Sequence, residues 1–226
     1  DPWQRDAWTR ANREVAGTMT DRFKTSVMMV DRQLGGGIPS ERMVAFVAPP
    51  TGQSETLLLE MAVQYPTVYL TTERPVPSVR STLREAGSDP ETHTIQRVDP
   101  ETPIIDSLRY VRQLPEHAVL VVDPVNLLEH ADEASYREFL ETLRTRLDNT
   151  GSIALFHCLD GERVPPQRDR TTYTADMVFE CRTKVEDGHV QTHLVIPKVR
   201  NGEAFDEEMK LEFGRSITVD RSRDIA

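Results

Sequence analysis

Lysine is scarce in this sequence. The chain has 27 Lys and Arg residues against 37 Asp and Glu residues, and its formal net charge is -10. The only lysines are Lys24, Lys184, Lys198 and Lys210. An acidic, lysine-poor surface is expected of a protein that stays soluble in a salty cytoplasm, as in halophiles, because the salt screens the charge. The composition therefore predicts an environment of high ionic strength.

Cysteine and long hydrophobic runs are also lacking. The two cysteines, Cys158 and Cys181, lie inside apolar runs without C-x-x-C spacing, which favours buried free thiols in a reducing compartment. No stretch approaches the roughly 18 apolar residues of a membrane span, and no signal-peptide pattern opens the sequence. We therefore expect a cytoplasmic protein with no membrane span.

The acidic balance argues against nucleic-acid binding. Such a chain lacks the overall positive field that draws DNA or RNA phosphates to a protein. One local exception is the arginine-rich loop from Arg163 to Arg170, which is flanked by Tyr173. This loop keeps a DNA-associated role open as an alternative.

Apolar strands and helical patterns alternate through most of the chain. Strands are expected at 44–47, 67–72, 94–98, 118–122 and 152–159, with helices at 56–64, 76–86, 104–113 and 132–148. A short helix is also expected from Val27 to the three glycines at 35–37, which end it. From residue 176 the pattern changes to hairpins, expected at 176–185 with 189–200 and at 209–213 with 216–219. This order predicts an α/β fold with a mostly parallel central sheet, flanking helices, right-handed crossovers and antiparallel C-terminal hairpins.

One loop has the outline of a phosphate-binding loop whose central charge is reversed. Laid over G-x-x-x-x-G-K-[ST], its positions are Pro49, Pro50, Thr51, Gly52, Gln53, Ser54, Glu55 and Thr56. A working loop points backbone N–H groups at the phosphate and adds a lysine charge. Here Pro49 has no N–H group, and Glu55 stands at the lysine position. A charge pair at ~4 Å is worth about 4 kcal/mol at an effective dielectric near 20. Reversing the charge at the lysine position therefore weakens phosphate binding more than the loss of a glycine of the pattern does.

Three polar residues lie at the edge of the sheet where ligands bind, outside the carboxyl ends of the parallel strands. Glu73 and Asp123 each follow a strand, and Thr56 begins a helix. Thr56 would bind Mg²⁺ through its hydroxyl group, and Asp123 would hold the ion through water. Glu73 would orient or deprotonate the attacking water. Taken singly, a hydroxyl residue at a helix start is usually a cap and an acid after a strand is usually a turn residue. The set predicts a magnesium-dependent nucleotide site if the loop still binds phosphate.

Four further segments carry a family resemblance. They are Leu-Gly-Gly-Gly-Ile-Pro at 34–39, Tyr-Leu-Thr-Thr-Glu at 69–73, Leu-Val-Val-Asp at 120–123 and Pro-Lys-Val-Arg-Asn-Gly at 197–202. With the loop, they resemble the KaiC-like branch of the RecA superfamily of ATPases, to which the gas-vesicle regulator GvpD is related. The chain is similar to the short, single-domain form of halophilic archaea over about residues 25 to 219. The resemblance implies a RecA-like P-loop NTPase fold that binds ATP at subunit interfaces of a ring or filament.

The resemblance also implies roles for individual residues. Lys198 and Arg200 match a K-x-R pair that reaches the γ-phosphate of the neighbouring subunit, and His157 stands where the superfamily often has a polar phosphate sensor. Simpler readings remain open, namely strand-edge cations on a solvated face and a hydrogen-bonded core histidine. The family usually has two adjacent acids after the second strand, but here Arg74 follows Glu73. Arg74 is a candidate replacement for the missing lysine charge.

The N-terminal segment stands apart from this resemblance. Residues 1–24 carry both tryptophans, Trp3 and Trp8, on a charged background that predicts a helical extension before a domain at 25–226. The extension either docks on its own domain or offers aromatic anchors to a partner.

The changed loop favours a degenerate RecA/KaiC-like protein that acts as a regulatory or scaffolding subunit, with weak or absent ATP hydrolysis. Such a subunit would associate with itself through RecA-type faces or with a protein partner. One alternative is an unconventional Mg-ATPase that uses Glu73 and Asp123. Another is a DNA-associated, recombinase-like or transcription-regulating protein. ATP and Mg²⁺ are therefore candidate cofactors that the chain has either kept or lost.

Overall fold

A computed structural model describes residues 21–186, 188–205, 207–214 and 217–220. Its strands are β1 (Arg22–Phe23), β2 (Ile38–Pro39), β3 (Met43–Ala48), β4 (Thr67–Thr71), β5 (Thr94–Arg97), β6 (Val119–Asp123), β7 (Ile153–Leu159), β8 (Met177–Glu186), β9 (His189–Val199), β10 (Met209–Phe213) and β11 (Ile217–Val219). Its helices are α2 (Met28–Gln33), α3 (Ser54–Ala62), α4 (Val76–Glu85), α5 (Pro103–Val111), α6 (Asn126–Glu129), α7 (Glu133–Thr150) and α8 (Arg168–Thr174), with a 3-10 turn η1 (Pro90–Thr92).

Within the described residues, nine strands form one sheet in the order β11-β10-β9-β8-β3-β7-β6-β4-β5. The strands from β8 to β5 in this order run parallel, whereas β9, β10 and β11 are antiparallel to their neighbours. β1 and β2 pair separately as a short antiparallel ribbon. The predicted α/β class, with a mostly parallel sheet and antiparallel C-terminal strands, is confirmed.

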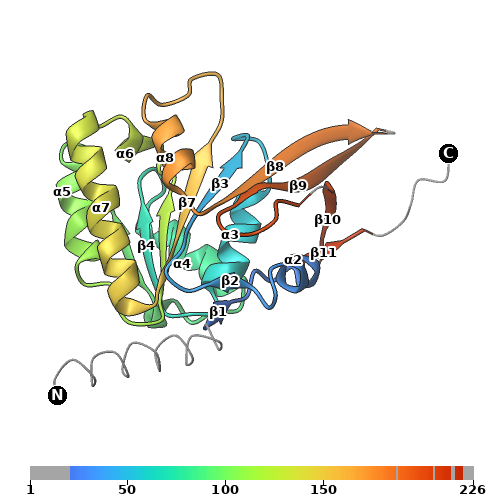
Figure 1. Cartoon of the computed structure of the whole chain (residues 1–226), viewed down its shortest axis with the longest axis horizontal. Helices are drawn as coiled ribbons and strands as arrows, with labels where there is room; N and C mark the ends of the chain where they lie inside the picture. Colours follow the sequence, from blue (N-terminus) through green and yellow to red (C-terminus); the bar gives the residue numbers. More distant parts are fainter. Residues whose placement is uncertain (1–20, 187, 206, 215–216, 221–226) are drawn as a thin grey trace, which may run out of the picture.

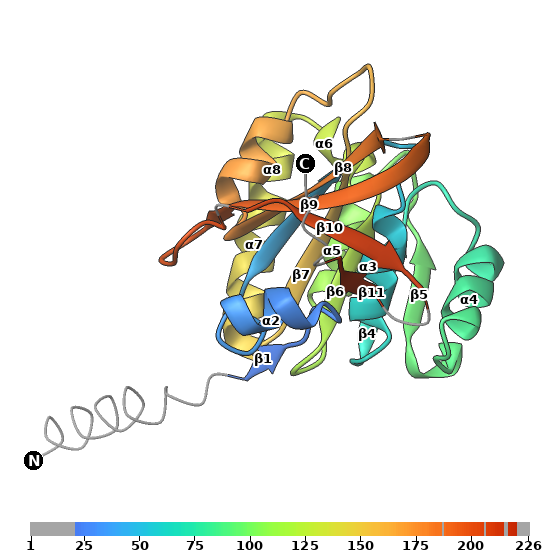
Figure 2. The same ribbon diagram turned by 90° about the vertical axis from the view of Figure 1, so that its right-hand side faces the viewer.

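Helices cover both faces of the parallel part of the sheet (Figure 1). One hydrophobic core lies between the sheet and α2, α3 and α4. A second core lies between the sheet and α5, α6 and α7. At one end of the molecule, α4 lies beside the edge strand β5 (Figure 2). The central strands are therefore buried on both sides, which is why their sequences are almost continuously apolar.

Helix α7 illustrates how local pattern and packing agree. The side chain of Asp132 caps its first turn by accepting a hydrogen bond from the Ser135 N–H group at 3.0 Å. Gly151 ends the helix with a φ of 62°, a left-handed conformation that glycine adopts without strain. The apolar side chains of this predicted helix form one buried stripe, which consists of Tyr136, Phe139, Leu140, Leu143 and Leu147.

The structure also contains elements that the sequence pattern did not predict. These are β1, β2, α6 and α8, and α8 lies in the C-terminal part of a segment that we expected to be a loop. The sequence of α8 has no apolar period, but Arg168 donates hydrogen bonds to the carboxylate of Glu129 at 2.7–3.1 Å. Thr171 donates another to Glu129 at 2.5 Å. Contacts with distant residues therefore stabilise α8.

The helix predicted for the N-terminal extension lies outside the described residues, apart from its last positions. There, Arg22–Phe23 forms β1 against Ile38–Pro39. In the described part of the chain, no helix is both long and apolar enough to cross a membrane. Cys158 and Cys181 are free and buried.

Candidate functional site

Two strands deliver a carboxylate and an imidazole to the same face of the sheet. Side chains alternate between the two faces along a strand. In β6, Val121 belongs to the core beneath α3, so Asp123, two residues later, faces the same side. In β7, Leu155 belongs to that core, and His157 follows it with the same spacing. Asp123 and His157 therefore meet under the start of α3.

Ser54, His157, Asp123 and Tyr69 form a hydrogen-bonded chain. The Ser54 hydroxyl, on the first residue of α3, lies 2.8 Å from His157 Nε2. His157 Nδ1 lies 2.6 Å from Asp123 Oδ1, and the Tyr69 hydroxyl donates to Asp123 Oδ2. Their relative exposures are 2% for Ser54, 5% for His157, 4% for Asp123 and 0% for Tyr69. These four hydrogen-bonded side chains are therefore almost completely shielded from water.

The surroundings of Asp123 keep its carboxyl group ionised. Burial by itself would raise the pKa of Asp123, but the hydrogen bonds from His157 and Tyr69 and the charges of His157 and Arg74 hold it below its usual value. Burial and the nearby carboxylate raise the pKa of Tyr69 well above its usual value, so Tyr69 remains a donor. An ionised carboxylate can only accept hydrogen bonds, so His157 carries a proton on Nδ1. When the imidazole is neutral, its Nε2 atom accepts a hydrogen bond from the Ser54 hydroxyl group.

Glu55 and Arg74 form an ion pair beside this chain. The pair joins Glu55 Oε1 to Arg74 Nη1, with Glu55 37% and Arg74 27% exposed. Arg74 Nη2 also donates to the hydroxyl groups of Thr82 at 2.6 Å and Ser78 at 3.3 Å on α4. Arg74 is thus held in place, and its charge is directed at Glu55.

The loop before α3 is closed by its own backbone and by neighbouring segments. The Gly52 N–H group donates to the Pro49 carbonyl at 2.9 Å, and neither Pro49 nor Pro50 has an N–H group. A Cβ atom placed on Gly52 would lie 3.2 Å from the Pro49 carbonyl oxygen and 3.5 Å from the Thr183 hydroxyl. A Cβ atom on Gly161 would lie 3.3 Å from Pro50 Cγ. Positions 49, 50 and 52 of the loop therefore offer no free backbone donor to a phosphate.

These contacts test whether Mg-ATP fits the residues present. Both oxygens of Asp123 already accept hydrogen bonds, so a metal-bound water would have to replace one of the donors. Arg74 cannot act as an unpaired phosphate cation while Glu55 neutralises it. The arrangement does not supply the donor set that the family pattern uses for Mg-ATP.

The other expected site residues are placed differently. Thr56 and Glu73 are exposed, at the start of α3 and after β4 respectively. In the described residues, no group of three or more His, Cys, Asp or Glu side chains could hold a metal ion. The structure therefore brings Ser54, Asp123 and His157 together, with Glu55 alongside.

Lys198 and Arg200 cap the C-terminal end of α8. Lys198 Nζ donates to the carbonyl groups of Thr172 at 2.8 Å and Tyr173 at 2.7 Å. Arg200 Nη2 donates to the Tyr173 carbonyl at 2.9 Å, and Arg200 Nε pairs with Asp176 at 3.2 Å. Cations at a helix C-terminus stabilise the exposed carbonyl groups.

Two arginines of the predicted nucleic-acid loop are paired with acids. Arg168 forms a buried ion pair with Glu129 at 2.7 Å, and Arg170 pairs with Glu133 at 2.6 Å. These contacts reduce the positive charge that the loop could offer to a phosphate backbone.

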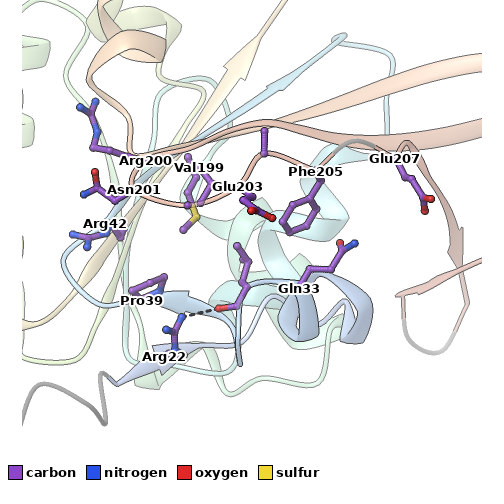
Figure 3. A pocket seen from close by; sticks show the side chains of 14 residues that line it. Arg22, Gln33, Pro39, Arg42, Val199, Arg200, Asn201, Glu203, Phe205 and Glu207 are labelled. Carbon is purple, nitrogen blue, oxygen red and sulfur yellow. Dashed lines mark hydrogen bonds between the residues drawn. The ribbon is translucent and has the colours of Figure 1, made fainter.

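A separate polar pocket lies near the beginning of β3, at the opposite end of that strand from the loop (Figure 3). Its volume is about 680 Å³, and Arg22, Arg42, Asn201 and Phe205 are among the residues that line it. Arg22 donates from this wall to the Leu34 carbonyl at 2.8 Å. The pocket is distinct from the predicted nucleotide site.

Tyr69 is the site residue that sequence reasoning missed. Tyr69 pairs with Val121 in the β4–β6 register, so its side chain points along the same face as Asp123 two residues further on. A large hydroxyl-bearing residue inside a fully buried strand was the available signal, because such a group needs a buried partner.

Comparisons with known proteins agree with this architecture. The fold matches the KaiC-like protein PH0186 of the hyperthermophilic archaeon Pyrococcus horikoshii OT3 with a TM-score of 0.71 and 18% sequence identity, over 89% of this chain and 99% of that one. The predicted KaiC-like, RecA-type fold is thereby confirmed. No functionally curated protein matches significantly. Residues 22–226 match the sequence model of DUF7125, a protein family of unknown function. The chain therefore belongs to the DUF7125 family.

Proposed function

We propose that this protein is a RecA-fold subunit that has lost efficient ATP hydrolysis and acts as a regulatory or scaffolding component. The ion pair between Glu55 and Arg74 carries the proposal. Glu55 places a negative charge where a phosphate-binding loop needs a positive one, and Arg74 is neutralised by that same carboxylate.

The position of Asp123 supports the loss of magnesium chemistry. A metal-binding carboxylate needs an oxygen that is free to accept a bond from the ion or its waters. Here one oxygen receives the imidazole N–H group of His157 and the other the phenol of Tyr69. Mg²⁺ binding would break at least one buried hydrogen bond, which costs about 1–3 kcal/mol for each group left without a partner.

The contacts of Lys198 and Arg200 support an assembly that does not depend on nucleotide. In an ATP-dependent ring, the K-x-R cations would have to leave their subunit and reach a neighbour's nucleotide, but Lys198 and Arg200 bind the end of α8 in their own chain. Self-association or partner binding would then depend on the surfaces of the fold and on the N-terminal segment that contains Trp3 and Trp8. We expect such association to be independent of nucleotide.

Thermal unfolding with and without ATP and Mg²⁺ tests the proposal. Measured at a fixed, high KCl concentration, the melting temperature should stay unchanged up to millimolar nucleotide, because a nucleotide that does not bind the folded state does not raise it. Phosphate release should stay at the background level. Light scattering coupled to size exclusion should give the same mass with and without ATP.

The alternative function, an unconventional Mg-ATPase that uses Glu73 and Asp123, predicts the opposite results in these measurements. A saturable rise in melting temperature, together with turnover that Glu73→Gln abolishes, would replace the scaffold proposal with that of an unconventional Mg-ATPase. A catalytically competent KaiC-like ATPase assayed under the same salt conditions serves as the positive control.

A further inference from the structure

The chain of Ser54, His157 and Asp123 can support chemistry that does not involve a nucleotide. Ser54 Oγ lies 2.8 Å from His157 Nε2, and His157 Nδ1 lies 2.6 Å from Asp123 Oδ1. This is the order of contacts that activates a serine nucleophile: hydroxyl to imidazole, and imidazole to carboxylate. Three separate elements, α3, β7 and β6, supply the three groups.

The local sequence and topology point in the same direction. Residues 52–56 read Gly-Gln-Ser-Glu-Thr, which matches the nucleophile-elbow pattern G-x-S-x-G except at its last position. Ser54 lies between strand β3 and helix α3, the strand–turn–helix context in which such a serine is presented. The chain order of serine, aspartate and histidine is also the order found in hydrolases with that elbow.

We propose that Ser54 is the nucleophile of an acyl-transfer site, with His157 as general base and Asp123 as the residue that orients the imidazole. The substrate class is a small, uncharged carboxylic ester. A small substrate suits a nucleophile that is 2% exposed, and an uncharged substrate suits the neighbouring Glu55–Arg74 ion pair, which carries no net charge.

The reaction balances with these groups and water. Ser54 Oγ forms a bond to the carbonyl carbon while its proton passes to His157 Nε2. The carbon–oxygen bond of the ester then breaks, and the leaving alkoxide takes that proton and departs as an alcohol. Water attacks the acyl-serine and transfers one proton through His157 to Ser54 as the carboxylic acid leaves.

Backbone N–H groups at the start of α3 can stabilise the oxyanion of this reaction. The first N–H groups of a helix have no partner within the helix. The N–H group of Glu55 follows the nucleophile directly, which is one of the two positions used for oxyanion binding in elbow-type hydrolases. Asp123 receives a further donor from Tyr69, which fixes the carboxylate that orients His157.

Access to Ser54 depends on its partly exposed neighbours. Glu55 and Arg74 are 37% and 27% exposed and lie beside the buried chain. Opening this ion pair would uncover the start of α3, so Glu55→Gln should make Ser54 more accessible without removing any of the three reacting groups.

A fluorophosphonate probe tests the site directly in the full chain. Ser54 Oγ would form a bond to phosphorus as the phosphorus–fluorine bond breaks, and the hydroxyl proton would leave with fluoride. Intact-mass measurement and peptide mapping should find one adduct per chain, on Ser54. Labelling should be several-fold faster in Glu55→Gln, absent in Ser54→Ala and at least about 100-fold slower in His157→Gln.

Matched variants keep the test decisive. Ser81→Ala, at an exposed serine of α4, should label like the wild type. Circular dichroism establishes that each variant is folded, and Asp123→Asn replaces His157→Gln if the latter does not fold. Absence of an adduct in both wild type and Glu55→Gln, an adduct on another serine, or labelling that survives loss of the base overturns the proposal. ATP binding is measured separately, so this result does not depend on the scaffold proposal.

Discussion

Glu55 and Arg74 show how two unfavourable residues can form one acceptable local structure. A glutamate at the start of α3 is favoured by the positive end of the helix dipole. Arg74 satisfies its charge and is itself held by Ser78 and Thr82 on α4. The pair therefore connects the first turn of α3 to the segment after β4.

Reversing one charge of this pair should destabilise the fold, and reversing both should restore it. Glu55→Lys places two cations together and should lower the free energy of unfolding by on the order of 1 kcal/mol, since the pair is partly exposed. The double change Glu55→Lys with Arg74→Glu should recover most of the loss. Denaturant unfolding of the single and double variants measures the coupling.

The control for this cycle is the ion pair between Arg80 and Glu91, in which Glu91 is 76% exposed. Charge reversal there should change the unfolding free energy by less than about 0.5 kcal/mol. Additive effects of the two changes at Glu55 and Arg74 would show that the pair does not contribute to stability in solution.

Tyr69 should matter for stability because it satisfies a buried charge. Tyr69→Phe preserves the packing but leaves Asp123 Oδ2 without its phenol donor, which should cost about 1–3 kcal/mol. Tyr110→Phe, at a partly exposed tyrosine that accepts from Arg109, should cost less than about 0.5 kcal/mol. Equal losses in the two variants, measured by denaturant unfolding, would contradict the role assigned to Tyr69.

His93 should make stability depend on pH. Burial lowers the pKa of His93 despite the opposing charge of Asp89, so the unfolded chain takes up the proton first as the pH falls. The neutral ring, 2.7 Å from the Ser88 hydroxyl, stabilises the fold above the ordinary histidine pKa of about 6.5. This contribution should be lost as the pH falls below that value and through the folded-state pKa.

Comparing the wild type with His93→Gln isolates this effect. The slope of unfolding free energy against pH between about 5 and 6.5 should be smaller in the variant. His130→Gln, at an exposed histidine, should leave the slope unchanged. Identical slopes in wild type and His93→Gln would exclude His93 as the source.

At the scale of elements, α8 depends on residues from three other segments. Its start is held by the buried carboxylate of Glu129 on α6, and its end by Lys198 and Arg200 from β9 and the turn after it. The helix itself is short and polar, so it would be marginal in isolation. Lys198 and Arg200 therefore stabilise the end of α8 within their own chain.

Removing the Lys198 cap should destabilise α8. Lys198→Met keeps the aliphatic stem but removes two hydrogen bonds to the last carbonyl groups, so we expect a loss of about 1 kcal/mol in unfolding free energy. Lys24→Met, at an exposed lysine elsewhere, should have a smaller effect. Unchanged stability, combined with a loss of assembly in light scattering, would instead favour the predicted contact with a neighbouring subunit.

At the scale of the whole molecule, the excess of acids sets the response to salt. With a net charge of -10, self-repulsion opposes the compact state, and added ions screen it. The melting temperature should therefore rise between about 0.05 and 0.5 M KCl, where screening changes most.

An uncharged osmolyte provides the comparison for this measurement. Sucrose stabilises through exclusion from the surface and should act to a similar extent at low and high salt. A melting temperature that falls as KCl is added over this range would contradict an environment-adapted acidic surface.

Much of the fold was predictable because its signals are local. Buried parallel strands have apolar runs such as Val119–Asp123, and α7 has both an apolar stripe and capping residues. α8 and the β1–β2 ribbon were missed because their sequences carry no such period. Arg168 and Thr171 form part of a stable helix only when Glu129 is beside them.

At the candidate site, too, some features follow from local sequence and others from contacts between distant residues, and the loop at 49–56 illustrates both. Its sequence alone determined that Pro49 has no N–H group and that Glu55 carries the wrong charge for phosphate, since both follow from residue chemistry. Only the tertiary structure decided where the remaining polar groups point. The alternation of β6 and β7 brings Asp123 and His157 under Ser54, and the end of β4 delivers Arg74 to Glu55. These contacts join residues up to 103 positions apart, and no local pattern specifies such distances.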